Sequence, residues 1–570
     1  MDDKVLEPVK YYERQGEQEH LDNINTHFNG LVEKSGVDIE ANHQTVERWK
    51  KEQEEIASLS KVLKKFKTFR IFLIIGIVIG AILTFNSFGQ FSESVGLGIL
   101  LLLLGVGAIV GSIMTIVKKV NPVIKDTDKV RQEHLEEAQR LENEGWAQMN
   151  NLNSLFTDED CVRLIEKTLP DFSFNKNFSV KQEKLFVEKY DFQDLQTDEC
   201  SMVDTLSGNC AGNPFLFGRR RIHRMGSQVY HGSLRITWTE TYRDSDGKIK
   251  TRQKSETLHA SVTKPKPFYN INTFLAFGNQ AAPNLSFSRQ SKHTENLSEK
   301  ALERKIKKGE RQLQKQAKKA IKNDGSFQEM ANSEFDVLFG ATDRDNEVEF
   351  RLMYTPLGQR STVELLKDSK HYGDDFDFIK QGKCNYIFSD HAQNWKMHVF
   401  ANDYKHFDYE EIKIRFINLN QTYFKSIFFD FAPFFCVPAY LEEPCESLEG
   451  NESYRTNYTY YEHEVMANAL DYRSFVHEES CTEAILKTQT LNTVDGNDVV
   501  AVTAYSYVGI DRIDYIPVKG GDGNYHNVPV PWIEYIPVSK TSHIVVSNES
   551  SPSDYTSVFY HGMSAGIMNN

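Results

Sequence analysis

The sequence predicts an α-helical membrane hairpin with an antiparallel coiled-coil stalk, followed by a cytosolic α+β region with a mixed or antiparallel sheet. Three observations lead to this fold class. Two apolar stretches interrupt an otherwise polar chain, helical stripes flank both of them, and the pattern beyond residue 169 alternates as strands do. The chain has 570 residues, which is enough for several folded units.

Six segments are expected, because the composition changes at five points along the chain. Their boundaries follow the apolar stretches, the change from helical to alternating pattern, and one strongly basic run. They are the N-terminal helices and first stalk helix (1–68), two transmembrane helices with a short external loop (69–117), the second stalk helix (118–168), a β-rich subdomain (169–295), a basic amphipathic helix (296–325) and an α+β domain (326–570).

The apolar stretches run from Phe69 to Phe88 and from Val95 to Val117. About 20 apolar residues in a helix cross the hydrocarbon core of a bilayer. Lys and Arg flank both stretches on their outer sides, while the connection Asn86–Ser94 has none. The positive-inside rule then predicts a multi-pass protein of the inner (cytoplasmic) membrane, with the lipid bilayer as a partner and both termini cytosolic.

Four glycines, Gly76, Gly80, Gly107 and Gly111, lie at four-residue spacing within the stretches. Small residues at this spacing allow two helix backbones to approach closely. The packing is either within one hairpin or between chains of a homo-oligomer, and the spacing leaves both open. Apart from Arg70 at the start of the first stretch, neither contains a charged residue, so a two-span transporter is not indicated.

Amphipathic helices are expected on both sides of the membrane segment. Val46 to Phe66 and Val130 to Leu155 repeat apolar residues at three- and four-residue steps, and together they predict the stalk. Leu21 to Leu31 predicts one further short helix. Pro122 is expected to kink the chain just after the second span.

The region beyond residue 169 is expected to be rich in strands. Gln228–Tyr242 and Lys248–Val262 alternate around a turn and predict a hairpin. Ile513–Val518 recurs as Ile533–Val538 across a glycine-rich connection, which predicts a second pair of strands. Thr362–Lys370 is expected to be helical. Further predicted strands are Phe335–Gly340, Val348–Tyr354, Cys384–Phe388, Trp395–Phe400, Ile412–Phe416, Val499–Tyr507 and Ile544–Ser547.

Charge and cysteine usage limit the partners. Lys and Arg number 66 against 80 Asp and Glu, a formal net charge of −14, so no nucleic-acid partner is expected. The seven cysteines are odd in number and lack CxxC spacing. Neither a disulfide framework nor a zinc ribbon is therefore indicated, and a reducing compartment is expected. No metal or other cofactor is expected.

Ser298–Lys322 contains ten Lys or Arg and three Glu, with an apolar stripe along one side. This pattern predicts a basic amphipathic helix, with Asn296 and Glu299 spaced as a capping box. Its stripe can dock on the sheet, its basic face can rest on anionic lipid headgroups, or the face can bind a protein or nucleic acid. The residues expected to contact an anionic surface are Lys305, Lys307, Lys308, Arg311, Lys315, Lys318 and Lys319.

No catalytic residues are predicted. Gly562–Gly566 has the GxSxG spacing of serine hydrolases, but only four residues follow it, and the partner acid and His must lie further along the chain. Asp343–Glu349 indicates a turn before a strand. The segment Asp374–His391 contains Asp374, Asp375, Asp377, Asp390 and His391, and a metal-dependent hydrolase using it is the alternative to a non-catalytic protein.

The stretch from Glu334 to His391 resembles a family of uncharacterised bacterial membrane proteins, some encoded beside LemA-type proteins. The resemblance is carried by Glu334-Phe335, by Glu349–Pro356 (EFRLMYTP) and by Leu365-Leu366. The family pairs two N-terminal spans with a cytosolic domain of no established activity, and shows a strand ending in Thr-Pro before a helix. The expected function is a membrane-anchored scaffold or regulatory protein without catalytic activity, acting on an unknown protein partner.

Overall fold

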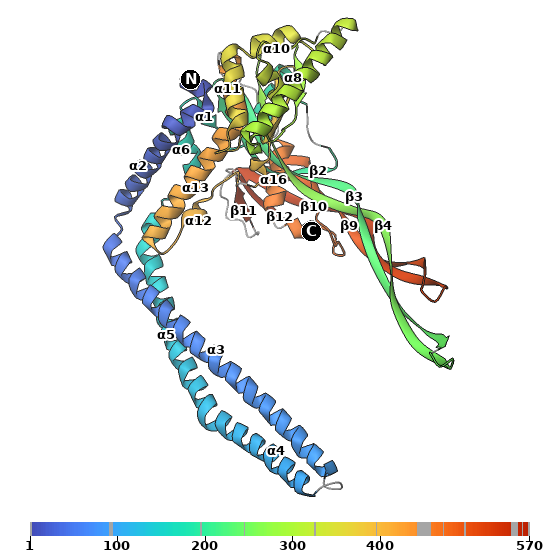
Figure 1. Ribbon diagram of the computed structural model, residues 1–570. Helices are drawn as coiled ribbons and strands as arrows, with labels where there is room; N and C mark the ends of the chain where they lie inside the picture. Colours follow the sequence, from blue (N-terminus) through green and yellow to red (C-terminus); the bar gives the residue numbers. More distant parts are fainter. Residues whose placement is uncertain are drawn as a thin grey trace. The chain divides into compact units, whose positions relative to one another are not determined.

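The computed structural model describes residues 3–90, 95–193, 197–243, 245–323, 327–394, 396–441, 458–470, 472–494, 497–548, 557–560 and 563–567. These residues form two units (Figure 1). The helical unit comprises Leu21–Asp160 and Val399–Asn420. The sheet unit comprises Met1–His20, Cys161–His398 and Gln421–Asn570. Residues 1–20, expected to belong with the stalk, are thus grouped with the C-terminal region, and 399–420 with the helices.

The helical unit is built on one long helix and its return. α3 (Ile39–Gln90) packs antiparallel against α4 (Val95–Thr115) and α5 (Asn121–Asn153) (Figure 1). A π-helical turn at Ile116–Val120 joins α4 to α5, and Pro122 lies in the first turn of α5. Proline lacks the N–H that would continue the hydrogen bonds of the preceding turn, and the π-helical turn lies just before it.

The helices of this unit contain two segments long and apolar enough to cross a membrane, within Ile39–Gly89 and Val95–Asn153. Their apolar side chains are exposed; Phe72 and Leu103, for example, are 65% and 66% accessible. A buried core helix of a soluble protein would cover such residues. The connecting residues 91–94, expected to form the external loop, lie outside the described part of the chain.

Outside the two apolar segments, α3 and α5 bury their expected apolar stripes against each other. The buried residues are Val46, Ile56 and Leu63 on α3, and Ala138, Leu141, Met149 and Leu152 on α5. Phe407 lies against both helices: its ring centroid is 5.1 Å from that of Trp49, and a Cβ on Gly145 would lie 3.0 Å from its ring. α2 (Glu17–Ser35), confirmed as helical, packs Phe28 on Phe416.

The sheet unit contains two fully antiparallel sheets. The first has the order β1 (Phe172–Phe174), β2 (Cys200–Cys210), β3 (Asn213–Arg243), β4 (Ile249–Gly278), β7 (Cys384–Ser389), β6 (Phe376–Gln381), β5 (Ser286–Arg289). The second has the order β11 (Ser557–Tyr560), β12 (Met563–Ile567), β10 (Tyr525–Asn548), β9 (Asn497–Lys519), β8 (Ile485–Val494). α16 (Tyr460–Ala469) packs on β2 of the first and β8 of the second.

α13 (Tyr409–Asp430) contributes residues to both units. The remaining α-helices are α1 (Pro8–Tyr11), α6 (Asp160–Thr168), α7 (Val180–Tyr190), α8 (Glu299–Lys322), α9 (Ser333–Phe339), α10 (Glu347–Met353), α11 (Pro356–Lys367), α12 (Ala401–Tyr404), α14 (Ala432–Phe435) and α15 (Pro438–Leu441). The single turns are η1 (Asp3–Leu6), η2 (Tyr12–Gly16), η4 (Thr294–Asn296), η5 (His391–Gln393) and η6 (Tyr472–Ser474).

Both predicted hairpins are confirmed. Gln228–Tyr242 lies in β3 and pairs with Lys250–Lys264 of β4. The predicted second strand, Lys248–Val262, lies in β4 except for Lys248, which precedes it. The repeated segments Ile513–Val518 and Ile533–Val538 lie in β9 and β10. The predicted strands at Cys384, Val499 and Ile544 are also confirmed. The predicted helix Thr362–Lys370 is the second half of α11 as far as Lys367, and its last three residues lie beyond the helix.

Three predicted strands are wrong. Phe335–Gly340 lies almost wholly in α9, Val348–Tyr354 in α10, and Ile412–Phe416 in α13. Residues 396–400, most of a fourth, form no strand. In α9 and α10 the buried aromatic residues are four apart, and the ring centroids of Phe335 and Phe339 lie 5.2 Å apart. Val348 and Leu352 are 68% and 69% exposed, so the buried positions have the helical period.

Candidate functional site: the basic face of α8

α8 is attached to the sheet unit along one side. Gly309 meets Val337 of α9 so closely that a Cβ would overlap that side chain, and Leu313 is buried. Glu310 accepts a hydrogen bond of 2.7 Å from Ser333 Oγ, and Lys305 Nζ donates one of 3.0 Å to the carbonyl of Lys292. The apolar stripe of α8 thus docks on the helix α9, while Ile321 at the C-terminal end of α8 is 75% exposed.

The other side of α8 is positively charged and unpaired. Nine of its ten cations are exposed, and none of the nine forms an ion pair with a carboxylate in the described part of the chain. Some exposed cations elsewhere in the sheet unit do form such an ion pair; Arg512, for example, lies 2.8 Å from Glu534. These nine residues, called the basic face below, are Lys300, Arg304, Lys307, Lys308, Arg311, Lys315, Lys318, Lys319 and Lys322.

Of the seven residues predicted to contact an anionic surface, six belong to the basic face; Lys305 is half-buried against the Lys292 carbonyl. The predicted capping box is wrong: the N-cap is Ser298, two residues after Asn296, and it makes no side-chain capping bond. Two arginines of β3 are engaged within the sheet unit: Arg219 donates to the Ala392 carbonyl and Arg221 pairs with Glu483. In Figure 1, α8 extends beyond the neighbouring helices at its far end.

The alternating carboxylates after Asp343 have a structural role. Asp343, Asp345 and Glu349 accept hydrogen bonds of 3.0, 2.7 and 2.9 Å from the backbone N–H groups of Ser288, Ser286 and Asn284. Ser286 and Ser288 belong to β5, the last strand of its sheet. The carboxylates thus cover the open edge of this strand, a role that the sequence pattern did not reveal, and the turn containing Asp343 leads into a helix.

The residues of the hydrolase alternative separate into different environments. Asp374 is fully buried, pairs with Arg289 and accepts a 3.0 Å hydrogen bond from Thr294 Oγ1. Asp375 instead contacts His391, and the side chain of Asp390 is 62% exposed. Within the described residues no group of three or more His, Cys, Asp or Glu side chains is arranged to hold a metal ion.

His391 lies in a buried polar cluster. Its Nδ1 is 2.6 Å from Asp375 Oδ2, its Nε2 is 3.2 Å from Asp430 Oδ1, and its ring stacks on Tyr372 at 3.7 Å between centroids. Burial lowers the pKa of His391, but the charges of Asp430 and Asp375 outweigh this effect and the net pKa is raised. Both ring nitrogens are engaged, so His391 is arranged as a buried ion pair rather than as a base open to substrate.

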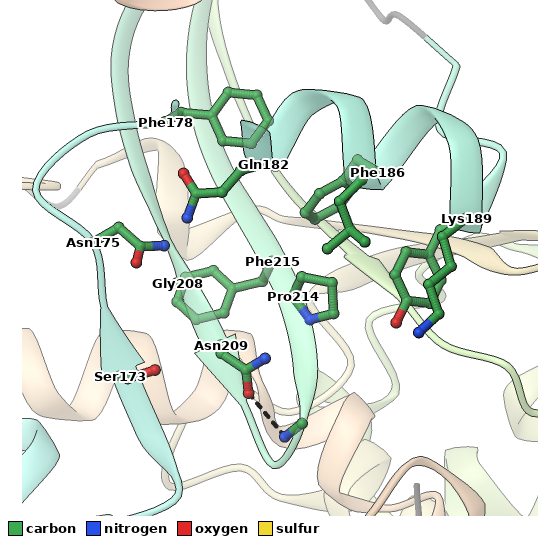
Figure 2. Close-up of a pocket in the computed structure, with 13 residues that line it drawn as sticks. Ser173, Asn175, Phe178, Gln182, Phe186, Lys189, Gly208, Asn209, Pro214 and Phe215 are labelled. Carbon is green, nitrogen blue, oxygen red and sulfur yellow. Dashed lines mark hydrogen bonds between the residues drawn. The ribbon is translucent and has the colours of Figure 1, made fainter. Parts of the chain in front are cut away.

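A cleft of about 240 Å³ lies between α7 and the β1–β2 region (Figure 2). Phe178, Phe186 and Phe215 form its apolar wall. Asn209 Oδ1 accepts a 2.8 Å hydrogen bond from the Gly212 N–H, and Gln182 is engaged in the capping box of α7. Ligand pockets usually measure about 300–1,000 Å³, so this cleft suits only a small molecule.

The four predicted packing glycines of the membrane segment differ in surroundings. A Cβ on Gly80 would lie 2.8 Å from the carbonyl oxygen of Gly105, and one on Gly76 would lie 3.2 Å from Ser112 Oγ. Both therefore face α4 within the hairpin. Gly107 and Gly111 have no atom within 4 Å of such a Cβ among the described residues.

No family model, no curated protein and no solved structure matches this chain.

Proposed function

We propose that the chain is a membrane-anchored scaffold or regulatory protein of the cytoplasmic membrane, without catalytic activity, whose α8 binds anionic lipid headgroups. The termini are then cytosolic, as the flanking Lys and Arg indicate. The observation that carries the proposal is the basic face: nine exposed cations without an acidic partner in the described chain, in a protein of net charge −14.

The energetics favour such a contact. Each Lys or Arg near an anionic membrane surface contributes about 1 kcal/mol of attraction. A few of the nine cations therefore suffice for binding, because covalent tethering raises the effective concentration of the membrane surface. The attraction decays over a Debye length of about 8 Å at physiological salt, so contact must be close and salt-sensitive.

The test uses the full chain in nanodiscs. A donor dye is attached to a cysteine at Gln312, which is exposed on α8, and acceptor dyes label the lipid headgroups. We expect energy transfer to be stronger with anionic than with zwitterionic lipid and to fall at high salt. Reversal of Lys307, Lys308, Arg311 and Lys315 to Glu should abolish the difference between the lipids.

A matched control reverses four exposed cations outside α8: Lys51, Lys176, Arg224 and Arg243. It has the same change in net charge and should leave the energy transfer unchanged. Transfer that is equal in both lipids, or that survives the reversals on α8, means that the basic face binds something other than lipid.

The anchor and its topology are tested separately. The protein should remain in the membrane after high-salt and carbonate washes. With Cys445 and the exposed Cys481 replaced by serine, an impermeant thiol reagent should label a cysteine at Ser92 in intact cells, but not one at the exposed Ser255. Ser92 and Cys445 lie outside the described residues. Label at Ser255 would place the sheet unit outside the cytosol.

A further inference from the structure

The β9–β10 hairpin packs face to face on the β3–β4 hairpin. Val528 packs between Ile236 and Leu258, and Lys264 pairs with Asp514 at 2.7 Å. Lys264 also lies 4.2 Å from the ring centroid of Trp532. One face of the β9–β10 hairpin is therefore firmly held by the other hairpin.

The opposite face of β9–β10 is apolar, and the described residues leave it exposed. Successive side chains of a strand point to opposite faces, so Ile513, Tyr515 and Pro517 share the face away from Asp514. Their cross-strand partners are Pro531, Pro529 and Asn527. Ile513 and Tyr515 are 54% and 63% exposed, and Tyr525 at the end of the same face is 72% exposed.

The neighbouring hairpin shows what a solvent-facing surface looks like in this protein. On the outer face of β3–β4, Thr237 pairs with Ser255 and Thr241 with Thr251, and all four are exposed. Such hydroxyl side chains suit a strand face in water. The apolar outer face of β9–β10 departs from this composition, as surfaces that bind another macromolecule do.

The charges on this face point to its partner. Asp511 and Lys519 lie on the apolar face, four residues before and four residues after Tyr515. Both are exposed, and neither forms an ion pair within the described part of the chain. A two-fold axis at Tyr515 would place Asp511 against the partner subunit's Lys519, and Lys519 against the partner subunit's Asp511. The same axis would stack the apolar residues between them.

We infer that the outer face of the β9–β10 hairpin binds the same face of a second copy of this chain. A two-fold interface uses the same surface patch on both subunits, and this patch is complementary to itself in charge and in apolar character. One positive and one negative charge at its ends do not select an anionic surface, in contrast to the basic face of α8. The inference is independent of the proposed lipid contact.

Crosslinking of the full chain tests the interface. Cys445 and Cys481 are replaced by serine, and Tyr515→Cys is treated with a short thiol–thiol crosslinker, because stacked sheets lie about 10 Å apart. We expect covalent dimers. Thr239→Cys on the outer face of β3–β4, which is also exposed, is the matched control and should give few.

Charge exchange then tests the register. Asp511→Lys and Lys519→Asp, each added alone to the Tyr515→Cys protein, place like charges together twice per dimer and should lower the crosslinking yield about tenfold. The double exchange restores both pairs and should recover the yield. Equal crosslinking at residues 515 and 239 overturns the inference, as does a double exchange no better than the single changes. Dimers held only by the membrane helices would give a double exchange with no higher crosslinking yield than the single changes.

Discussion

At the residue scale, the sheet unit places several charges in its interior and compensates each one nearby. Asp374 is held by Arg289 and Thr294, and His391 by Asp375 and Asp430. A buried charge without such partners would cost several kcal/mol. The arrangement of His391 therefore gives its protonated form a structural role, which makes stability depend on pH.

The replacement His391→Gln tests this dependence. Because the pKa of His391 is raised in the folded protein, the protonated histidine stabilises the fold fully below its unfolded pKa of about 6.5. This stabilisation is lost as the pH rises through the folded pKa. Wild type should therefore exceed the variant by about 1.5–3 kcal/mol at pH 5.5, and the difference should shrink toward pH 9.

Thermal unfolding of the full chain at a series of pH values measures this difference. The control His231→Gln changes an exposed histidine that forms no ion pair with any carboxylate of the described residues, and the stability of this variant should follow wild type at every pH. A stability difference for His391→Gln that grows with pH would mean that His391 is neutral in the fold.

At the element scale, close contacts decide which helices and strands can lie together. β5 has one edge on β6 and the other on three carboxylates, so it exposes fewer free N–H groups to other strands. In the helical unit, Gly80 and Gly105 let α3 and α4 approach until a Cβ would no longer fit. Glycines of the same sequence spacing differ in this respect.

Gly80→Ile should destabilise the packing of α3 on α4 by about 1–3 kcal/mol, since the added side chain must displace the Gly105 backbone. Gly107→Ile is the matched control, because open space surrounds its position in the described structure. Unfolding of the reconstituted chain by denaturing detergent compares the two. If Gly107→Ile is equally disruptive within the monomer, the observed helix pairing is wrong. If it leaves the monomer intact but lowers crosslinking between copies, Gly107 packs against a second chain.

At the scale of the whole molecule, the two units do not follow the order of the chain. The N-terminal residues belong to the sheet unit: Tyr12 is buried there, with ring centroids 5.0 and 5.4 Å from those of Phe429 and Phe428. Ser361 Oγ donates to the Leu6 carbonyl. A fragment starting at residue 169 would lack these contacts, so experiments on binding require the full chain.

Tyr12→Ala should lower the free energy of unfolding of the sheet unit by about 3–5 kcal/mol, the usual cost of emptying a buried aromatic site. Tyr242→Ala, at an exposed position of β3, should change it by less than about 0.5 kcal/mol. Proteolysis in increasing urea reports both. Equal resistance of Tyr12→Ala and wild type would show that residues 1–20 contribute nothing to this unit.

The amino-acid pattern alone determined the features that depend on neighbours along the chain. The two apolar helices, α8 and the β3–β4 and β9–β10 hairpins all follow from periodicity and from turn residues close by in the sequence. Membrane insertion, the coiled coil and the function remain predictions.

Only the tertiary structure decided the rest. Phe335 and Tyr354 have a strong preference for strands, yet their rings pack 4.9 Å apart between two helices, because burial in an aromatic cluster outweighs local preference. His391 meets Asp430 from another helix, and Gly80 faces Gly105 while Gly107 faces open space. These contacts join residues distant in sequence or depend on helix rotation, so no local pattern records them.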